Sequence, residues 1–107
     1  IGVASADSIA YLFGNLIPPN PELEFGAHLH TRAENWREKV QAAYDNGCRR
    51  FDGAIKGYGG CPMARDELTG NMPTENLIDF FKKSNEDIGI NEDAFQEALT
   101  YSGNVFL

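Results

Sequence analysis

Segments with the residue pattern of β-strands alternate in this sequence with segments that have the pattern of amphipathic helices. A strand followed by a helix and another strand pairs in parallel through a right-handed crossover, so this order predicts a parallel α/β fold. Both a small open sheet and part of a barrel satisfy the order. In either architecture, ligands bind at the carboxyl ends of the strands.

The boundaries of the expected elements follow from hydrophobic periodicity and from capping residues. Thr31 and Glu34 have the spacing of a capping box, and Gly47 is expected to end the helix that this box begins. The expected strands are residues 1–6, 24–30 and 49–55, and the expected helices are residues 8–17, 31–46, a segment beginning at Pro73 and a last segment capped by Asn91.

The length and charge of the chain limit both its fold and its partners. The 107 residues are enough for one small domain. The 16 acidic and 9 basic residues give a net charge of −7, which argues against nucleic acid and anionic membranes as partners. No apolar run is long enough to cross a bilayer. The 2 cysteines are too few for a secreted disulfide scaffold, so we predict a reducing compartment and a cytoplasmic protein.

Several side chains able to bind metals or take part in catalysis fall at or just beyond the expected strand ends. His28 and His30 are two positions apart on one strand, so both imidazoles project from the same face. Such a pair can supply half of a metal site, and the alternative is one packed and one solvated histidine. The other residues at or just beyond expected strand ends are Asp7, Cys61 and Asn71. Asp7 is either a site residue or only a helix cap.

The third expected strand runs into a loop with glycines at positions 57, 59 and 60, followed by Cys61 and Pro62. Glycines leave the backbone without side chains, so a ligand can approach the main chain closely and the thiol of Cys61 can reach it. The alternative is a surface turn with an incidental thiol. Cys48, at the entry to the strand, is expected to be a small buried residue.

The residue types leave the identity of the metal open. Imidazole, amide and carboxylate groups suit Mg²⁺, Mn²⁺ or Zn²⁺. Zn²⁺ is favoured if Cys61 is a direct ligand. If Cys61 faces the substrate instead, a Mg²⁺ or Mn²⁺ site with Asn71 as the third protein ligand is favoured.

The loop sequence G-Y-G-G-C-P at residues 57–62, preceded by His28-Leu29-His30 and followed by Gly70-Asn71, resembles the C-terminal part of 3-hydroxy-3-methylglutaryl-CoA lyase. This family belongs to a group of metal-dependent lyases and acyl synthases built on a TIM barrel. The related isopropylmalate and homocitrate synthases share His-x-His and Gly-Asn but lack Gly-Cys-Pro, so the match favours the lyase branch.

The resemblance implies that residues 1–107 are a single C-terminal fragment of a (β/α)8 barrel lyase domain, with about the last three βα units and a C-terminal helix. It implies a divalent metal, Mg²⁺ or Mn²⁺ rather than Zn²⁺, held by His28, His30 and Asn71. It also implies a catalytic Cys61. Positions close to the substrate or to the metal ligands are implied for Asp7, Gly59 and Gly60.

The activity that the resemblance implies is the cleavage of 3-hydroxy-3-methylglutaryl-CoA into acetyl-CoA and acetoacetate. The family's Arg-Asp pair on the first barrel strand has no counterpart here, so the chain is expected to be inactive alone. Three strands cannot close a barrel. The expected partners are therefore an acyl-CoA and either further copies of the chain or the missing N-terminal half. In a eukaryote, the expected compartment is the mitochondrial matrix.

Two other functions remain open at this point. The first alternative is a non-catalytic, metal-binding α/β domain that has lost catalysis with the Arg-Asp pair. The second is a relative of aldolases or acyl synthases that acts on another acyl or keto acid.

Overall fold

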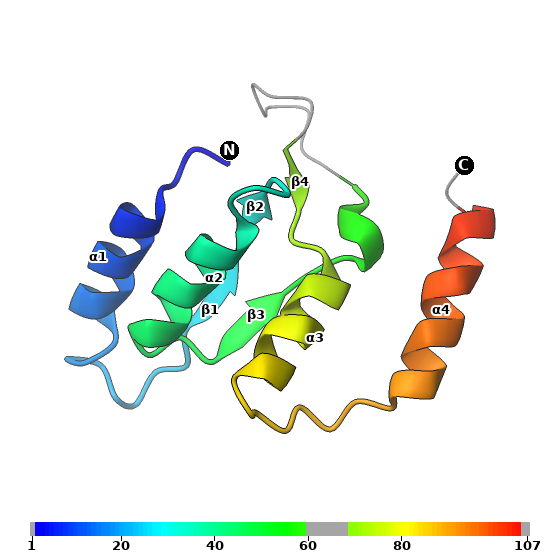
Figure 1. Ribbon diagram of the computed structural model, residues 1–107. Coiled ribbons are helices and arrows are strands. Elements are labelled where there is room, and N and C mark those ends of the chain that lie inside the picture. The colour runs from blue at the N-terminus through cyan, green and yellow to red at the C-terminus, as the bar shows by residue number, and fades with distance from the viewer. Residues whose placement is uncertain (1, 60–68, 106–107) are drawn as a thin grey trace.

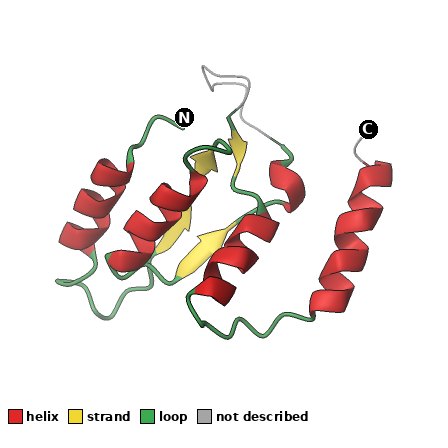
Figure 2. Cartoon of the chain, in the orientation of Figure 1, coloured by secondary structure: helices red, strands yellow, loops and turns green. Residues whose placement is uncertain are grey.

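The computed structural model describes residues 2–59 and 69–105. Figures 1 and 2 show a short set of strands with helices packed against it, and a last helix that lies apart from the others. The helices are α1 (Ala6–Leu16), α2 (Trp36–Asp45), the 3-10 turn η1 (Ile55–Gly57), α3 (Thr74–Lys83) and α4 (Glu92–Val105), and the strands are β1 (Gly26–His28), β2 (His30–Thr31), β3 (Arg50–Asp52) and β4 (Gly70–Asn71).

The strands form a parallel pair and an antiparallel pair. β1 lies parallel to β3, with His28 opposite Asp52. β2 lies antiparallel to β4, with His30 opposite Asn71. The expected strand at residues 24–30 is thus divided at Leu29, and each part pairs with a different partner. The mixed α/β fold with a parallel pair joined through a helix confirms the predicted fold class.

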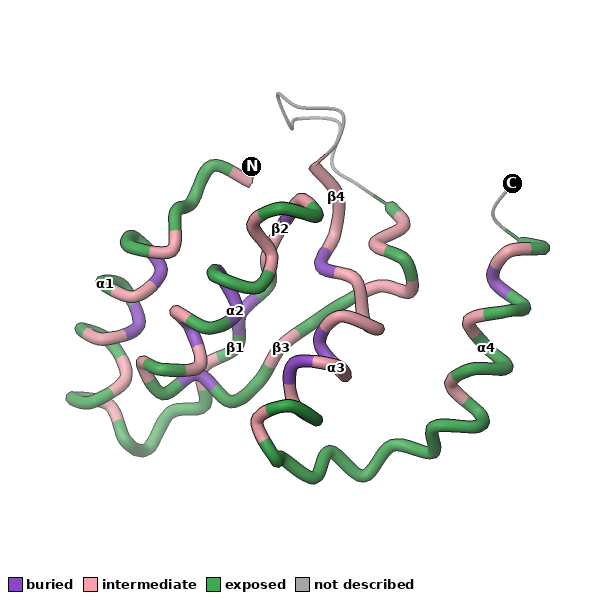
Figure 3. Tube along the Cα trace, viewed as in Figure 1, coloured by how far each residue is buried: buried purple, intermediate pink, exposed green. Residues whose placement is uncertain are grey.

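The hydrophobic core lies between the strands and one layer of helices. α1, α2 and α3 lie next to one another on one face of the strands (Figure 1). Figure 3 shows that the buried positions concentrate where these helices meet the strands, and that α4 is largely exposed. One buried cluster joins α1, β1 and α2, and it consists of Ile9, Phe13, Ala27, Ala43 and Cys48. A second joins α2 and α3, and it consists of Val40, Met72, Leu77 and Phe80.

The opposite face of β1 and β3 is open. Ala27 is buried and Phe51 half-buried beneath the helices, whereas Gly26 and His28 on one strand and Arg50 and Asp52 on the other are exposed. This alternation is the period of two that a strand imposes on its side chains. In a closed barrel, such a face would line the interior.

The prediction of a first strand at residues 1–6 is wrong for the part that the structure describes, because residues 2–5 form no strand and α1 already begins at Ala6. Ser5 and Ser8 make a capping box, in which each hydroxyl accepts a hydrogen bond from the other residue's backbone N–H. This local box satisfies the backbone at the start of the helix. The small residues before it have no comparable strand partner within residues 2–59 and 69–105.

The predicted capping box of Thr31 and Glu34 is also wrong. Thr31 belongs to β2, and its buried hydroxyl donates to the sulfur of Met72, 3.7 Å away. α2 begins only at Trp36, after a turn in which the side chain of Asn35 accepts from the backbone N–H of Arg32 at 2.8 Å. Pairing with β4 and burial therefore outweigh a local helix signal of about 1 kcal/mol.

The first expected helix, at residues 8–17, is observed as α1 from Ala6 to Leu16. The boundaries predicted at Gly47, Pro73 and Asn91 are confirmed. Gly47 has φ +99° and follows the end of α2, and α3 begins directly after Pro73. The side chain of Asn91 accepts from the backbone N–H of Ala94 at 3.0 Å and so caps α4. None of the helices in the described part of the chain has the length and apolar character needed to traverse a bilayer.

Candidate metal centre

The two histidines meet at the carboxyl end of the β1–β3 pair. Their ring centroids are 5.1 Å apart and the rings are nearly perpendicular, at 83°. His28 is exposed on the open face of the sheet, and His30 is half-buried where the chain crosses from β1 to β2. The structure thus brings the rings of the predicted His-x-His pair together.

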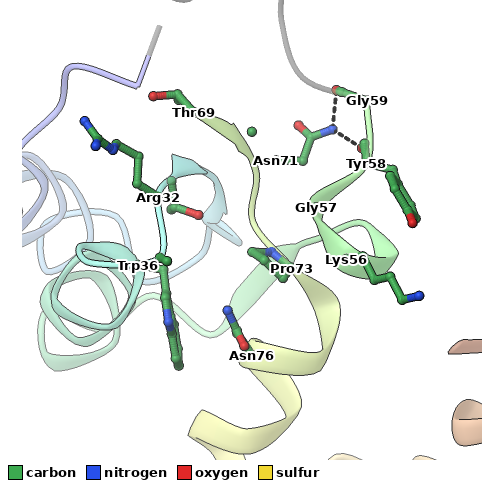
Figure 4. Close-up of a pocket in the computed structure, with 13 residues that line it drawn as sticks. Arg32, Trp36, Lys56, Gly57, Tyr58, Gly59, Thr69, Asn71, Pro73 and Asn76 are labelled. Carbon is green, nitrogen blue, oxygen red and sulfur yellow. Dashed lines mark hydrogen bonds between the residues drawn. The ribbon is translucent and has the colours of Figure 1, made fainter. Parts of the chain in front are cut away.

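Asn71 is held next to this pair by backbone pairing and by its own amide. It lies directly opposite His30 in the β2–β4 ladder, so the two side chains project from the same side. Its Nδ2 atom donates hydrogen bonds to the carbonyl oxygens of Tyr58 at 2.8 Å and Gly59 at 2.5 Å. Figure 4 shows the amide oxygen directed away from these carbonyls. The amide is therefore fixed with its oxygen available to a cation.

The glycine loop packs closely against β4. Gly57 has φ +71°, and a β-carbon at this position would lie 2.7 Å from the carbonyl oxygen of Asn71. Gly59 has φ +83° and supplies one of the two carbonyls that hold the Asn71 amide. The described glycines of the loop thus permit a close approach of the loop to the chain itself and support the Asn71 side chain.

The electrostatic setting of His30 favours a neutral imidazole. Burial, followed by the neighbouring His28 ring, lowers the pKa of His30 below its ordinary value, although the backbone of Gly70 acts in the opposite direction. A neutral ring keeps an unshared electron pair on one nitrogen, which is the form that binds metals.

An unpaired buried nitrogen of His30 indicates whether these residues suit a divalent cation. The Nδ1 atom of His30 is buried without a hydrogen-bond partner in the described part of the chain, which costs free energy unless a ligand satisfies it. Among residues 2–59 and 69–105, no three His, Cys, Asp or Glu side chains are grouped to hold a metal. A site here therefore needs the Asn71 amide, and the donor set of two imidazoles and one amide fits a divalent cation with open positions.

The remaining predicted residues are placed only in part. Asp7 is exposed in the first turn of α1 and does not follow a strand, so its predicted position at a strand end is wrong. A carboxylate there complements the helix dipole. Cys61 and Gly60 lie outside the described residues. Cys48 is fully buried as predicted, and burial raises the pKa of its thiol.

Sequence reasoning missed two residues that touch the centre. Lys39 is only 3% exposed, and its Nζ atom donates to the carbonyl oxygens of Gly2 and His30, both at 3.2 Å. Burial lowers the pKa of this ammonium group. The Oδ2 atom of Asp52 lies 3.8 Å from Nδ1 of His28. The strand alternation already placed Asp52 on the face opposite Phe51, but only the register of β1 and β3 sets it against His28.

A hollow of about 420 Å³ lies beside Asn71. It opens between the start of α2, the η1 loop and the start of α3 (Figure 4). Trp36, Lys56, Tyr58 and Asn76 are among the side chains that line it. Its volume is in the usual range of small-molecule sites, which runs from about 300 to 1,000 Å³.

Comparison with known proteins relates both the sequence and the fold to acyl-CoA lyases. No protein-family model matches the chain. The (R)-citramalyl-CoA lyase of Chloroflexus aurantiacus is 32% identical over 89 residues, which are 83% of this chain and 28% of that protein. A 3-hydroxy-3-methylglutaryl-CoA (HMG-CoA) lyase of Acinetobacter baumannii, solved in complex with coenzyme A and 3-methylmalate, is 30% identical with a TM-score of 0.76, over 92% of this chain and 32% of that one.

A second solved structure shows the likeness of fold over almost the whole chain. The HMG-CoA lyase of Brucella melitensis matches with a TM-score of 0.83 and 22% identity, over 98% of this chain and 37% of that one. The fold is therefore part of the barrel on which these lyases are built. Over most of its length, the chain is therefore HMG-CoA lyase-like in sequence and fold. It spans between 28% and 37% of the length of these three relatives.

Proposed function

We propose that this chain carries the divalent-metal centre of a carbon–carbon lyase that cleaves a 3-hydroxyacyl-CoA. The observation that carries the proposal is the packing of the His28 and His30 rings near the carboxyl end of β1, with Asn71 directly opposite His30 and its amide oriented by hydrogen bonds. A parallel α/β fold places its active site at this end. HMG-CoA, which would yield acetyl-CoA and acetoacetate, is the substrate proposed first, because two of the compared relatives are HMG-CoA lyases.

The roles proposed for the residues follow from their positions. His28, His30 and Asn71 would hold Mg²⁺ or Mn²⁺, in preference to Zn²⁺ because an amide oxygen is a hard ligand. A bound cation would supply Lewis-acid chemistry to the oxygens of the substrate. The carbonyls of Tyr58 and Gly59 hold the Asn71 amide in place. The hollow beside Asn71 has the size to take part of an acyl-CoA.

Cys61 is proposed as a general acid. When the carbon–carbon bond breaks, its electron pair passes to the fragment that becomes the enolate of the acyl-CoA product, and the proton of the substrate hydroxyl goes to a base. The thiol of Cys61 would then give its proton to the enolate carbon. Gly60 and Gly59 would let this loop approach the substrate. Asp7, exposed in the first turn of α1, is proposed to lie close to the substrate.

The proposed partner is the complement of the barrel. The open face with Gly26, His28, Arg50 and Asp52 would be covered either by the N-terminal units of such a barrel or by further copies of this chain. Cleavage would need those units, because the family's first-strand Arg-Asp pair comes from them. A cytoplasmic location, or the mitochondrial matrix in a eukaryote, stays a prediction.

Mixing this chain with the N-terminal two thirds of the A. baumannii lyase, in the presence of Mn²⁺, tests the proposal. The mixture is expected to form acetyl-CoA from HMG-CoA, while the chain alone forms none. The same assay with citramalyl-CoA examines the substrate, because one relative is a citramalyl-CoA lyase. Cys61→Ala is expected to reduce turnover at least 100-fold, the lower range of general acid catalysis being about 10²-fold, and to leave the Kd for Mn²⁺ within about twofold.

The outcomes separate the candidate functions. Undiminished turnover by Cys61→Ala would remove the proposed role of the thiol. Mn²⁺ binding without cleavage of either substrate, in a mixture shown to associate, would favour the non-catalytic metal-binding domain. Cleavage of citramalyl-CoA or another acyl-CoA, but not of HMG-CoA, would favour a relative with a different substrate.

A further inference from the structure

Asp52 faces His28 across the parallel strands. The two residues are direct partners in the β1–β3 register, so their side chains project from the same, open face of the sheet. The Oδ2 atom of Asp52 lies 3.8 Å from Nδ1 of His28. Both residues are the last of their strands, at the edge where the candidate metal centre lies.

The contact is too exposed to be explained as a stabilising ion pair. The side chains are 62% and 64% exposed, and a solvent-exposed pair of this kind contributes about 0–1 kcal/mol. At 3.8 Å the two atoms are also about 0.6–1 Å beyond hydrogen-bond distance, which a small side-chain rotation or one bridging water would close. The position of the carboxylate opposite Nδ1 bears instead on which ring nitrogen of His28 carries the proton.

The tautomer of a histidine decides which of its ring nitrogens can bind a metal. A histidine that binds a metal through one nitrogen usually directs its other N–H to a carboxylate, which fixes the tautomer and the orientation of the ring. A carboxylate opposite Nδ1 favours a proton on Nδ1 and leaves the electron pair on Nε2. Asp52 itself is not part of any group of three His, Cys, Asp or Glu ligands in residues 2–59 and 69–105.

We propose that Asp52 is a positioning residue of the candidate centre, which holds His28 with its proton on Nδ1 so that Nε2 is free to bind the cation. The role in metal binding rests on the proposed function. The preference for one tautomer, in contrast, is a property of the chain without metal and can be measured separately.

The experiment compares Asp52→Ala with Glu24→Ala, a matched control from the same chain. The Oε1 atom of Glu24 also lies 3.8 Å from its partner, Nη1 of Arg50, and both of these side chains are exposed. Two-bond ¹H–¹⁵N correlation spectra, recorded near pH 8, identify the tautomer of His28 in the metal-free chain. Titration with Mn²⁺ measures the affinity of the same samples.

The proposal predicts an Nδ1–H tautomer for His28 in the wild-type chain and in Glu24→Ala. Asp52→Ala is expected to shift His28 towards Nε2–H and to raise the Kd for Mn²⁺ by about 10- to 100-fold, the effect of removing such a partner. Asp52→Glu, which restores a carboxylate, is expected to recover most of the Nδ1–H population. Because Asp52 is exposed, none of these changes is expected to prevent folding, and circular dichroism checks this.

The results distinguish this inference from the proposed function. An unchanged His28 tautomer in Asp52→Ala would overturn the positioning role, even if Mn²⁺ binds tightly. A shifted tautomer in a chain that binds no Mn²⁺ would support the orientation of His28 by Asp52 and count against its role at a metal, together with the metal-binding function itself.

Discussion

Replacing both His28 and His30 with alanine is expected to raise the Kd for Mn²⁺ at least about 100-fold. Removing a residue that only hydrogen-bonds to a metal ligand already costs about 10- to 100-fold in metal affinity. His28 and His30 are proposed as ligands themselves, so the loss should be at least as large. The expected loss is large because residues 2–59 and 69–105 contain no group of three His, Cys, Asp or Glu side chains that could retain the ion. Electron paramagnetic resonance of free Mn²⁺ during a titration gives the affinity directly.

A second pair of substitutions provides the control for this result. Asn71→Ala removes the proposed amide ligand opposite His30 and is expected to weaken Mn²⁺ binding at least about tenfold, because even the loss of a residue that only orients a ligand costs that much. Asn76→Ala removes an amide at the start of α3 that also lines the hollow, and it is expected to leave the affinity within about twofold. Equal affinities of the double alanine variant and the wild-type chain would exclude the two imidazoles as ligands.

Gly57→Ala is expected to destabilise the chain by about 2–4 kcal/mol and to weaken Mn²⁺ binding as well. The residue has φ +71°, a conformation that costs other residues about 1–2 kcal/mol. The new β-carbon would in addition lie 2.7 Å from the carbonyl oxygen of Asn71, so the loop or β4 must move. Movement of either would disturb the hydrogen bonds that hold the Asn71 amide. Urea unfolding measures the first effect and Mn²⁺ titration the second.

Gly89→Ala separates the strain of the backbone from the close contact. Gly89 has φ +65°, nearly the same as Gly57, but a β-carbon there would have no atom within 4 Å. This substitution is expected to cost only about 1–2 kcal/mol, from the backbone alone, and to leave Mn²⁺ binding unchanged. If the two alanine variants lose the same stability and both retain the wild-type affinity, the loop does not position Asn71 as proposed.

The predictions from sequence succeeded where the signal is local. Gly47 ends α2, Pro73 precedes α3 and Asn91 caps α4, because each depends on the conformation or the side chain of one residue. The rings of His28 and His30 do lie together, 5.1 Å apart, although the strand expected to carry both is divided at Leu29.

The predictions failed where distant parts of the chain compete with a local signal. Thr31 was expected to cap a helix, but pairing with Gly70 and burial against Met72 place it in β2. The contact of Asp52 with His28 depends on the register of two strands whose paired residues are 24 positions apart, which no local pattern specifies. Lys39 reaches the His30 carbonyl from a buried position of α2. The role of Cys61, outside the described residues, stays a prediction.

Electron spin-echo spectroscopy of Mn²⁺ bound to the chain, with ¹⁵N incorporated only in histidine, tests the central proposal most directly. The sequence contains 2 histidines, so any ¹⁵N coupling to the ion identifies His28 or His30. We expect couplings from two histidine nitrogens, one of which disappears in each single alanine variant. Bound Mn²⁺ that shows no histidine coupling would contradict the metal centre described here.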